Sequence, residues 1–279
     1  MSSFILWSDL TLPPLPAVYL LSVSLPLLIL SEVNTFHTGL AVFKIISSIA
    51  FVSGPFMLSE WSPYQRLITY GLVLSLIGDI CLIPSRSEFQ RSSSTEPRRG
   101  SENSDSPKRD EISNSFKLGV AAFAGAHIAY IIAFLENADT IDRQPLIGTF
   151  LATLVLARFL GVIFPGKGPS PWNNILNLTI TGEMRPLVTI YALIIGSMLA
   201  VSAATISPSA STGFPRQRLL GAIMFVLSDL FVAKDAFGNW DVRKGGNKLT
   251  SGRHSYLKVG LGFGLYFWAQ MVLAGTVYE

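Results

Sequence analysis

Cysteine, histidine and charged residues are all scarce in this 279-residue sequence. The one cysteine, Cys81, excludes an internal disulfide and a cysteine-based zinc module. The three histidines, His37, His127 and His254, form no HExxH motif and no convincing metal cluster. We therefore expect no metal and no other cofactor. The basic residues lie in the connections between apolar runs, so the net charge of +3 does not indicate a nucleic-acid partner.

The sequence instead contains many long apolar runs. Hydrophobic residues make up 49% of the chain, and the mean hydropathy of +0.45 is above that of an ordinary soluble domain. A helix needs about 20 mainly apolar residues to cross about 30 Å of hydrocarbon. The sequence thus predicts an all-α polytopic membrane protein, a single transmembrane domain over 1–279 with about eight transmembrane helices. The predicted spans are residues 15–31, 38–58, 66–84, 117–135, 145–164, 185–205, 217–234 and 257–276.

The stretch 85–115 differs in composition from the rest of the chain. It holds ten serines, six basic and six acidic residues and almost nothing apolar. Such a composition buries too little apolar surface to offset the entropy lost on ordering. We predict a disordered Ser-rich loop on the cytoplasmic side.

Lysine and arginine are concentrated in alternate connections. Most lie after the third and seventh predicted spans, within 86–117 and 234–258. Because basic connections remain cytoplasmic, both termini are predicted to be lumenal or exoplasmic. The endoplasmic reticulum membrane is the expected location of such a multi-pass chain.

A few ionisable residues lie within the predicted spans or at their edges. An ionisable residue at the centre of a span costs about 2.5–3.5 kcal/mol, so it usually has a partner or a task. The residues that meet this criterion are Lys44, Asp79, His127, Arg158, Arg185 and Asp229. They are the first candidates for a functional site.

Two of these acids have matching contexts. Gly71 precedes Asp79 by eight positions, and Gly221 precedes Asp229 by the same interval. The third and seventh spans, which carry them, run in the same direction, a pattern typical of membrane proteins built from two parallel four-helix repeats. The placement of the two acids is therefore compatible with two related four-helix halves.

Each of these acids has a basic residue at a comparable depth. Lys44 and Arg185 enter the preceding spans near the depth of Asp79 and Asp229, so all four could share one cavity. One interpretation is a pair of salt bridges that hold helices together. The other is an acid–base site, since two carboxylates in a low-dielectric site can supply an acid and a base at neutral pH.

Two further pairs of polar residues share helix faces. His127 and Tyr130 are three positions apart, and Tyr266 and Gln270 are four apart. Each pair could form hydrogen bonds in the same cavity. A lone histidine in an apolar helix is also compatible with a simple packing role.

Several short strings, in order, resemble the YhhN-like family of eight-span membrane proteins, which includes the lysoplasmalogenases. The resemblance runs from about Lys44 to Gln270 without the Ser-rich loop, and its strings are the GD that ends at Asp79, FKLGVAAFAGAHIAYIIAF, RPLVTIYALIIGSMLA, the SD that ends at Asp229, and YFWAQ. It implies hydrolysis of the vinyl ether bond of lysoplasmalogens to a fatty aldehyde and a glycerophospho-ethanolamine or glycerophosphocholine. The implied partners are a lysophospholipid substrate and membrane lipid.

The candidate residues suit this implied reaction. Protonation of the alkenyl carbon needs a general acid, and the oxocarbenium ion that results needs a carboxylate and water. Asp79 and Asp229 are the catalytic candidates, with no preference for which is the acid. The candidate substrate-binding residues are Lys44 and Arg185 for the phosphate, with Ser228, His127, Tyr130, Tyr266 and Gln270 as polar lining.

Two other functions fit the same residues. A proton- or cation-coupled transporter would also use buried acids and a histidine, although it needs polar groups that reach both faces of the membrane. A catalytically silent membrane scaffold descended from the enzyme would keep the fold alone.

Overall fold

The computed structural model describes residues 10–84, 114–164, 172–205, 216–238 and 256–278. Within these residues the chain forms eight α-helices, two single-turn 3-10 helices and no strand, apart from two isolated bridges. The α-helices are α1 (Leu15–Val33), α2 (His37–Ser53), α3 (Pro63–Cys81), α5 (Asn114–Glu136), α6 (Arg143–Leu160), α7 (Arg185–Ala204), α8 (Gln217–Phe237) and α9 (Tyr256–Gly275). The 3-10 helices are η2 (Pro55–Met57) and η4 (Thr276–Tyr278).

The all-α prediction is confirmed, and one helix lies in each of the eight predicted ranges. The largest difference is at α2, which ends at Ser53 because Gly54 and Pro55 break the helix and begin η2. The predicted disordered loop lies outside the described residues over 85–113. Its last two residues, Asn114 and Ser115, belong instead to the first turn of α5.

The apolar helices identify the chain as an integral membrane protein. Four helices are long and apolar enough to cross a membrane, namely α1, α5, α7, and α9 with η4. Helix α2 is apolar but has 17 residues. Helices α3, α6 and α8 carry internal polar residues such as Asp79, Arg158 and Asp229, which lower their hydropathy.

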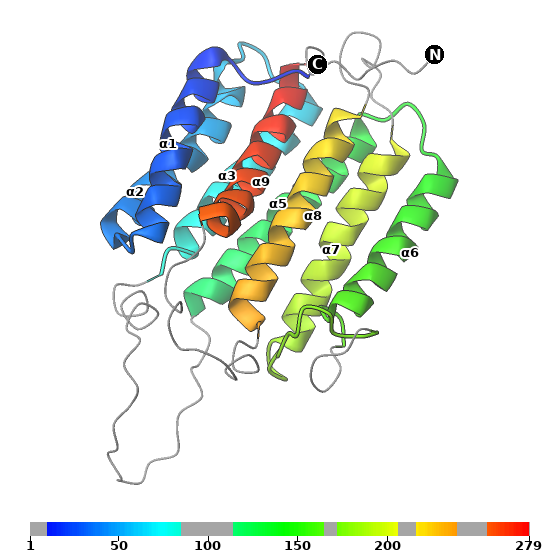
Figure 1. Cartoon of the computed structure of the whole chain (residues 1–279). Helices are drawn as coiled ribbons and strands as arrows, with labels where there is room; N and C mark the ends of the chain where they lie inside the picture. Colours follow the sequence, from blue (N-terminus) through cyan, green and yellow to red (C-terminus); the bar gives the residue numbers. More distant parts are fainter. Residues whose placement is uncertain (1–9, 85–113, 165–171, 206–215, 239–255, 279) are drawn as a thin grey trace, which may run out of the picture.

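The helices run side by side in one bundle (Figure 1). Helices α1–α2, α2–α3 and α3–α5 are neighbours in the first half, and α6–α7, α7–α8 and α8–α9 are neighbours in the second. The halves meet where α5 packs on α7 and where α9 packs on α1, α2 and α3. The same order of neighbours thus occurs twice, and it places α3 and α8 at equivalent positions.

Local sequence signals define the ends of several helices. Helix α3 begins with Ser62 and Gln65 in a reciprocal capping box and with Pro63 at its first position. Helix α6 ends at Gly161, whose φ of 86° lies in the left-handed region that glycine tolerates best. These capping residues define where the helices begin and end, whereas the apolar pattern alone gives only approximate ends.

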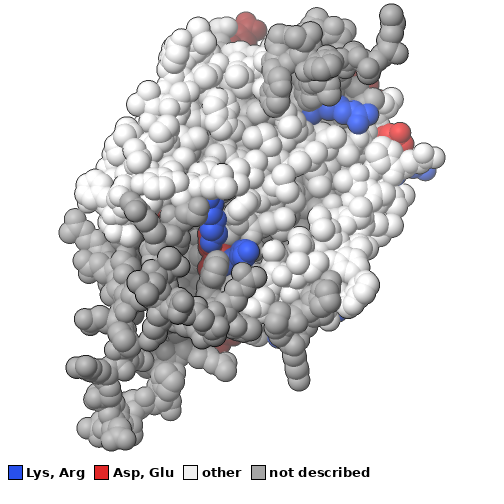
Figure 2. All heavy atoms as spheres, in the orientation of Figure 1, with Lys and Arg blue, Asp and Glu red and all other residues white. Residues whose placement is uncertain are grey.

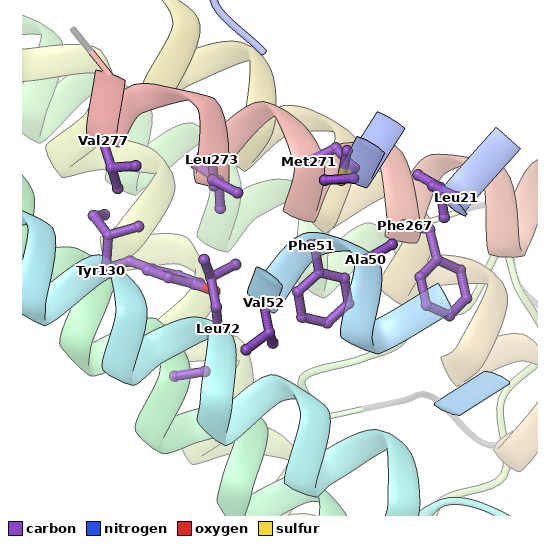
Figure 3. Packing of buried hydrophobic residues seen from close by; sticks show 14 of the residues in the cluster. Leu21, Ala50, Phe51, Val52, Leu72, Tyr130, Phe267, Met271, Leu273 and Val277 are labelled. Carbon is purple, nitrogen blue, oxygen red and sulfur yellow. The ribbon is translucent and has the colours of Figure 1, made fainter. Parts of the chain in front are cut away.

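Close packing of large on small residues forms the core, part of which is drawn in Figure 3. The fully buried side chains include Phe51, Leu72 and Tyr130. Gly71 lets α5 approach α3, since a Cβ at that position would lie 2.2 Å from Cε1 of Tyr130. Gly221, at the equivalent position of α8, receives Leu273 of α9 in the same way.

The two ends of the bundle can be distinguished by their hydrogen bonds. At one end, which also holds the C-terminal turn, Gln217 binds the backbone of Thr11 and Tyr278 binds that of Gly54. At the other end, α1, α3, α6 and α8 finish and α2, α5, α7 and α9 begin. The described part of the face drawn in Figure 2 is mostly white, with one small group of charged side chains toward that second end and others at the edge of the first.

Candidate active site

Asp79 lies near the end of α3, and its carboxylate contacts three polar side chains. Lys44 Nζ is 3.5 Å from its Oδ1. Its Oδ2 accepts hydrogen bonds from Ser48 Oγ at 2.7 Å and from Tyr266 Oη at 2.6 Å. Lys44 and Ser48 are four residues apart, so they lie on the face of α2 that packs against α3. The site therefore balances a buried charge with a cation and two donors, as burial requires.

The contacts of Asp79 also keep it out of solvent. Its exposed fraction is 2%, and that of Lys44 is 8%. Tyr266 reaches Asp79 from α9, in the other half of the bundle. Three helices thus hold this carboxylate in place.

Asp229 on α8 has a different environment. Its Oδ2 accepts a hydrogen bond from Tyr191 Oη at 2.6 Å, and its side chain is half-buried. Among the described residues it has no ion pair, since the two ion pairs present are Lys44–Asp79 and Lys258–Asp235. A single neutral hydroxyl group therefore supports this carboxyl.

His127 extends the contacts of Asp229 into the core. Its Nε2 lies 3.2 Å from Tyr191 Oη, and its side chain is fully buried. The ring of Phe225 packs against it edge-on, with 4.4 Å between ring centroids. Its other nitrogen, Nδ1, is buried and has no hydrogen-bond partner in the described part of the chain. His127, Tyr191 and Asp229 thus form one line of hydrogen bonds.

A second line of hydrogen bonds lies one helical turn deeper than Asp79. Tyr130 Oη donates to Gln270 Oε1 at 2.8 Å, and Gln270 Nε2 donates to Ser75 Oγ at 2.9 Å. Ser75 precedes Asp79 by four residues, and Gln270 follows Tyr266 by four. The second line therefore supports the two helix faces that carry Asp79 and Tyr266.

A cavity of about 270 Å³ opens beside both aspartates. Apolar side chains of α5, α6, α7, α8 and α9 form most of its wall. Its charged lining residues are Glu32, Lys44, Asp79, Asp229, Asp235 and Lys258. Tyr191 and Tyr266, the hydroxyl donors to the two aspartates, also line it. The cavity thus combines a large apolar wall with four carboxyl groups, of which Asp79 on α3 and Asp229 on α8 accept hydrogen bonds from these tyrosines.

The predicted site residues fall into three groups. Lys44, Asp79, Asp229 and Tyr266 line the cavity. The second group, buried behind the wall, comprises His127, Tyr130, Gln270 and Ser228. Ser228 donates to the backbone carbonyl of Phe225 in its own helix.

Arg185 forms the third group. It is exposed in the first turn of α7 and is not among the residues that line the cavity. The residue of α7 that reaches Asp229 is Tyr191, less than two turns further on. The two aspartates therefore do not have matching bases, because one pairs with a lysine and the other with a tyrosine.

Three polar residues of the site are not among the candidates that the sequence pattern selects. Ser48, Ser75 and Tyr191 are uncharged, so a search for ionisable groups within spans passes over them. A search for any hydroxyl group four residues from a selected residue would have found Ser48 and Ser75. No three His, Cys, Asp or Glu residues of the described segments lie close enough together to hold a metal ion.

The chain matches the model of the YhhN family over residues 40–277, and among the described residues that line the cavity only Glu32 lies outside this range. No curated protein and no solved structure shows a significant match. The match covers well over half of the chain and both aspartates. By this match, the chain belongs to the YhhN family.

Proposed function

We propose that this protein is a lysoplasmalogenase-like hydrolase that cleaves the vinyl ether bond of lysoplasmalogens. The products would be a fatty aldehyde and a glycerophospho-ethanolamine or glycerophosphocholine. One observation carries the proposal: Asp79 and Asp229 open on the same largely apolar cavity. Membership of the YhhN family is consistent with it.

The reaction needs a proton donor, a carboxylate and a water molecule. Protonation of the alkenyl carbon turns the vinyl ether into an oxocarbenium ion, which a carboxylate stabilises and water attacks. Two carboxyl groups on separate helices can divide these tasks without a nucleophilic serine. In this respect the site resembles the paired carboxylates that hydrolyse glycosidic bonds, which pass through a similar cation.

The cavity suits a lipid with a polar head. Its apolar wall can hold the alkenyl chain. Lys44 and Lys258 can attract the phosphate, and Glu32 and Asp235 can attract the ammonium group of the zwitterionic head. Such a site would bind a single-chain phospholipid more readily than a free sugar or nucleotide.

We further propose that all eight helices cross the membrane. The four less apolar helices run alongside the four that are apolar enough to span. The cavity lies at the end of the bundle from which the Lys- and Arg-rich stretches 86–117 and 234–258 leave, so it would face the cytoplasm. Both termini would then be lumenal, with the endoplasmic reticulum membrane as the expected location.

Purified protein in detergent or liposomes, given a lysoplasmenyl-ethanolamine or lysoplasmenyl-choline, should release fatty aldehyde. Asp79→Asn and Asp229→Asn should each lower this rate by about 100-fold or more, as loss of a general acid or base does. Asp139→Asn is the matched control, because Asp139 is exposed and lies outside the cavity. Full activity in a folded Asp79→Asn or Asp229→Asn variant would remove that residue from the mechanism.

A further inference from the structure

We infer that Asp229 is the proton donor of the reaction, and that Tyr191, oriented by His127, is the positioning residue that turns the acid proton of Asp229 toward the cavity. The inference rests on the proposed vinyl ether hydrolysis and assigns different tasks to the two aspartates. It follows from the hydrogen bonds around each carboxyl group.

Both oxygens of Asp79 are already committed to donors. Oδ2 accepts from Ser48 and Tyr266, and Oδ1 faces the ammonium group of Lys44. A carboxylate satisfies all three neighbours at once, whereas a protonated carboxyl would direct an O–H at one of them. The contacts therefore hold Asp79 as the anion, which suits it to stabilise a cation in the cavity and not to give up a proton.

The contacts of Asp229 leave one of its carboxyl oxygens available to carry a proton. Oδ2 accepts from Tyr191, and no other polar partner of Asp229 exists among the described residues. Oδ1 is therefore the oxygen available to a molecule in the cavity. A protonated Asp229 that keeps the Tyr191 hydrogen bond carries its proton on Oδ1, where it can reach a substrate.

His127 determines the direction of this hydrogen bond. A phenol has one proton, so Tyr191 can donate to Asp229 only if its other contact donates to it. The Nε2–H form of His127 does this, and it leaves Nδ1 bare. The opposite form would place an N–H at Nδ1, where no acceptor lies in the described structure, and orphaned buried N–H groups are rare. The order of donors is therefore His127 to Tyr191 to Asp229.

The proposed step balances as follows. The O–H bond at Oδ1 of Asp229 breaks, and the π electrons of the alkene form a C–H bond with that proton at the carbon remote from the ether oxygen. The oxocarbenium ion that results is stabilised by the carboxylate of Asp79. Water adds to the carbon that bears the ether oxygen, and its proton returns to Asp229. The hemiacetal then collapses to the aldehyde, and its hydroxyl proton passes to the departing glyceryl oxygen.

Infrared spectroscopy of the detergent-solubilised full chain at neutral pH tests the assignment without turnover. The carbonyl stretch of a protonated carboxyl group should be present in the wild type and in Asp79→Asn. It should be absent from Asp229→Asn and shifted in Tyr191→Phe, which loses the hydrogen bond to Oδ2. A band that survives in Asp229→Asn, or one that disappears only in Asp79→Asn, would overturn the inference. Absence of aldehyde release by the wild type would instead contradict the proposed function, whatever the spectrum.

Kinetics of two substitutions at His127 test the positioning role. Gln places an amide N–H near the position of Nε2, whereas Leu fills space without a donor. We expect His127→Leu and Tyr191→Phe to lower kcat by about tenfold or more with little change in KM, because each weakens the hydrogen bond that supports the negative charge left on Asp229 as it gives up its proton. His127→Gln should recover most of the lost rate. An equal loss in His127→Gln and His127→Leu would show that the residue acts through packing alone.

Discussion

The two aspartates beside the cavity are held in opposite ways. Asp79 is buried, paired with Lys44 and bonded to two hydroxyl groups, whereas Asp229 is half-buried and bonded to one. The same order of neighbouring helices carries both residues. The comparison shows that one architecture supplies two different environments, because α2 contributes a lysine where α7 contributes a tyrosine. The predictions below test this difference, from the largest expected effect to the smallest.

Replacing each aspartate by asparagine should separate activity from stability. Both variants should lose about 100-fold or more of aldehyde release, Asp229→Asn through loss of the proton donor and Asp79→Asn through loss of the carboxylate that stabilises the cation. Asp79→Asn should also lower the free energy of unfolding by about 3 kcal/mol or more, because it leaves the buried ammonium of Lys44 unpaired. Asp229→Asn should leave thermal stability nearly unchanged, since Asp229 has no ion pair among the described residues. Equal melting temperatures for the two variants would contradict the difference between the environments.

Neutralising the buried pair from the other side should give a matching result. Lys44→Met leaves the Asp79 carboxylate without its cation and should destabilise the protein by about 3 kcal/mol or more. The double variant Lys44→Met/Asp79→Asn should recover much of that loss while remaining inactive. Thermal melts of the four proteins measure the coupling. Additive losses in the double variant would mean that the two residues do not act as a pair.

The equivalent glycines of the two halves should differ in sensitivity. Gly71→Ala places a Cβ 2.2 Å from the ring of Tyr130 and should cost about 1–3 kcal/mol through overpacking. Gly221→Ala meets the flexible side chain of Leu273 and should cost less. Gly264→Ala is the control, because nothing lies within 4 Å of its added Cβ. A control that melts as early as Gly71→Ala would show that the effect is not due to the Tyr130 contact.

The smallest effect is expected at the edge of the cavity. Lys258 and Asp235 join α8 and α9 through a partly exposed ion pair, and such pairs contribute about 1 kcal/mol or less. Lys258→Met should therefore leave the melting temperature nearly unchanged but raise KM for a phospholipid substrate. A large loss of stability would place this pair in the core and not at the rim.

Apolar run length was enough to locate the helices, because the hydrocarbon thickness dictates the length of a spanning helix. Charge within those runs was enough to single out Lys44, Asp79 and Asp229, which line one cavity. Tyr191 could not be recognised in this way, since tyrosine is uncharged and common in membrane helices. The exposed position of Arg185 depends on the direction of its side chain at the start of α7, which spacing does not define.

Hydrolysis in deuterium oxide tests the central claim most directly. A lysoplasmalogen with a vinyl ether bond is incubated with the purified protein in D₂O, and the aldehyde is trapped by reduction and analysed by mass spectrometry. Protonation at carbon by an exchangeable acid predicts one deuterium on the carbon next to the aldehyde carbon, with Asp229→Asn forming almost no product. Release of a fatty acid, or of an aldehyde without deuterium, would contradict the account.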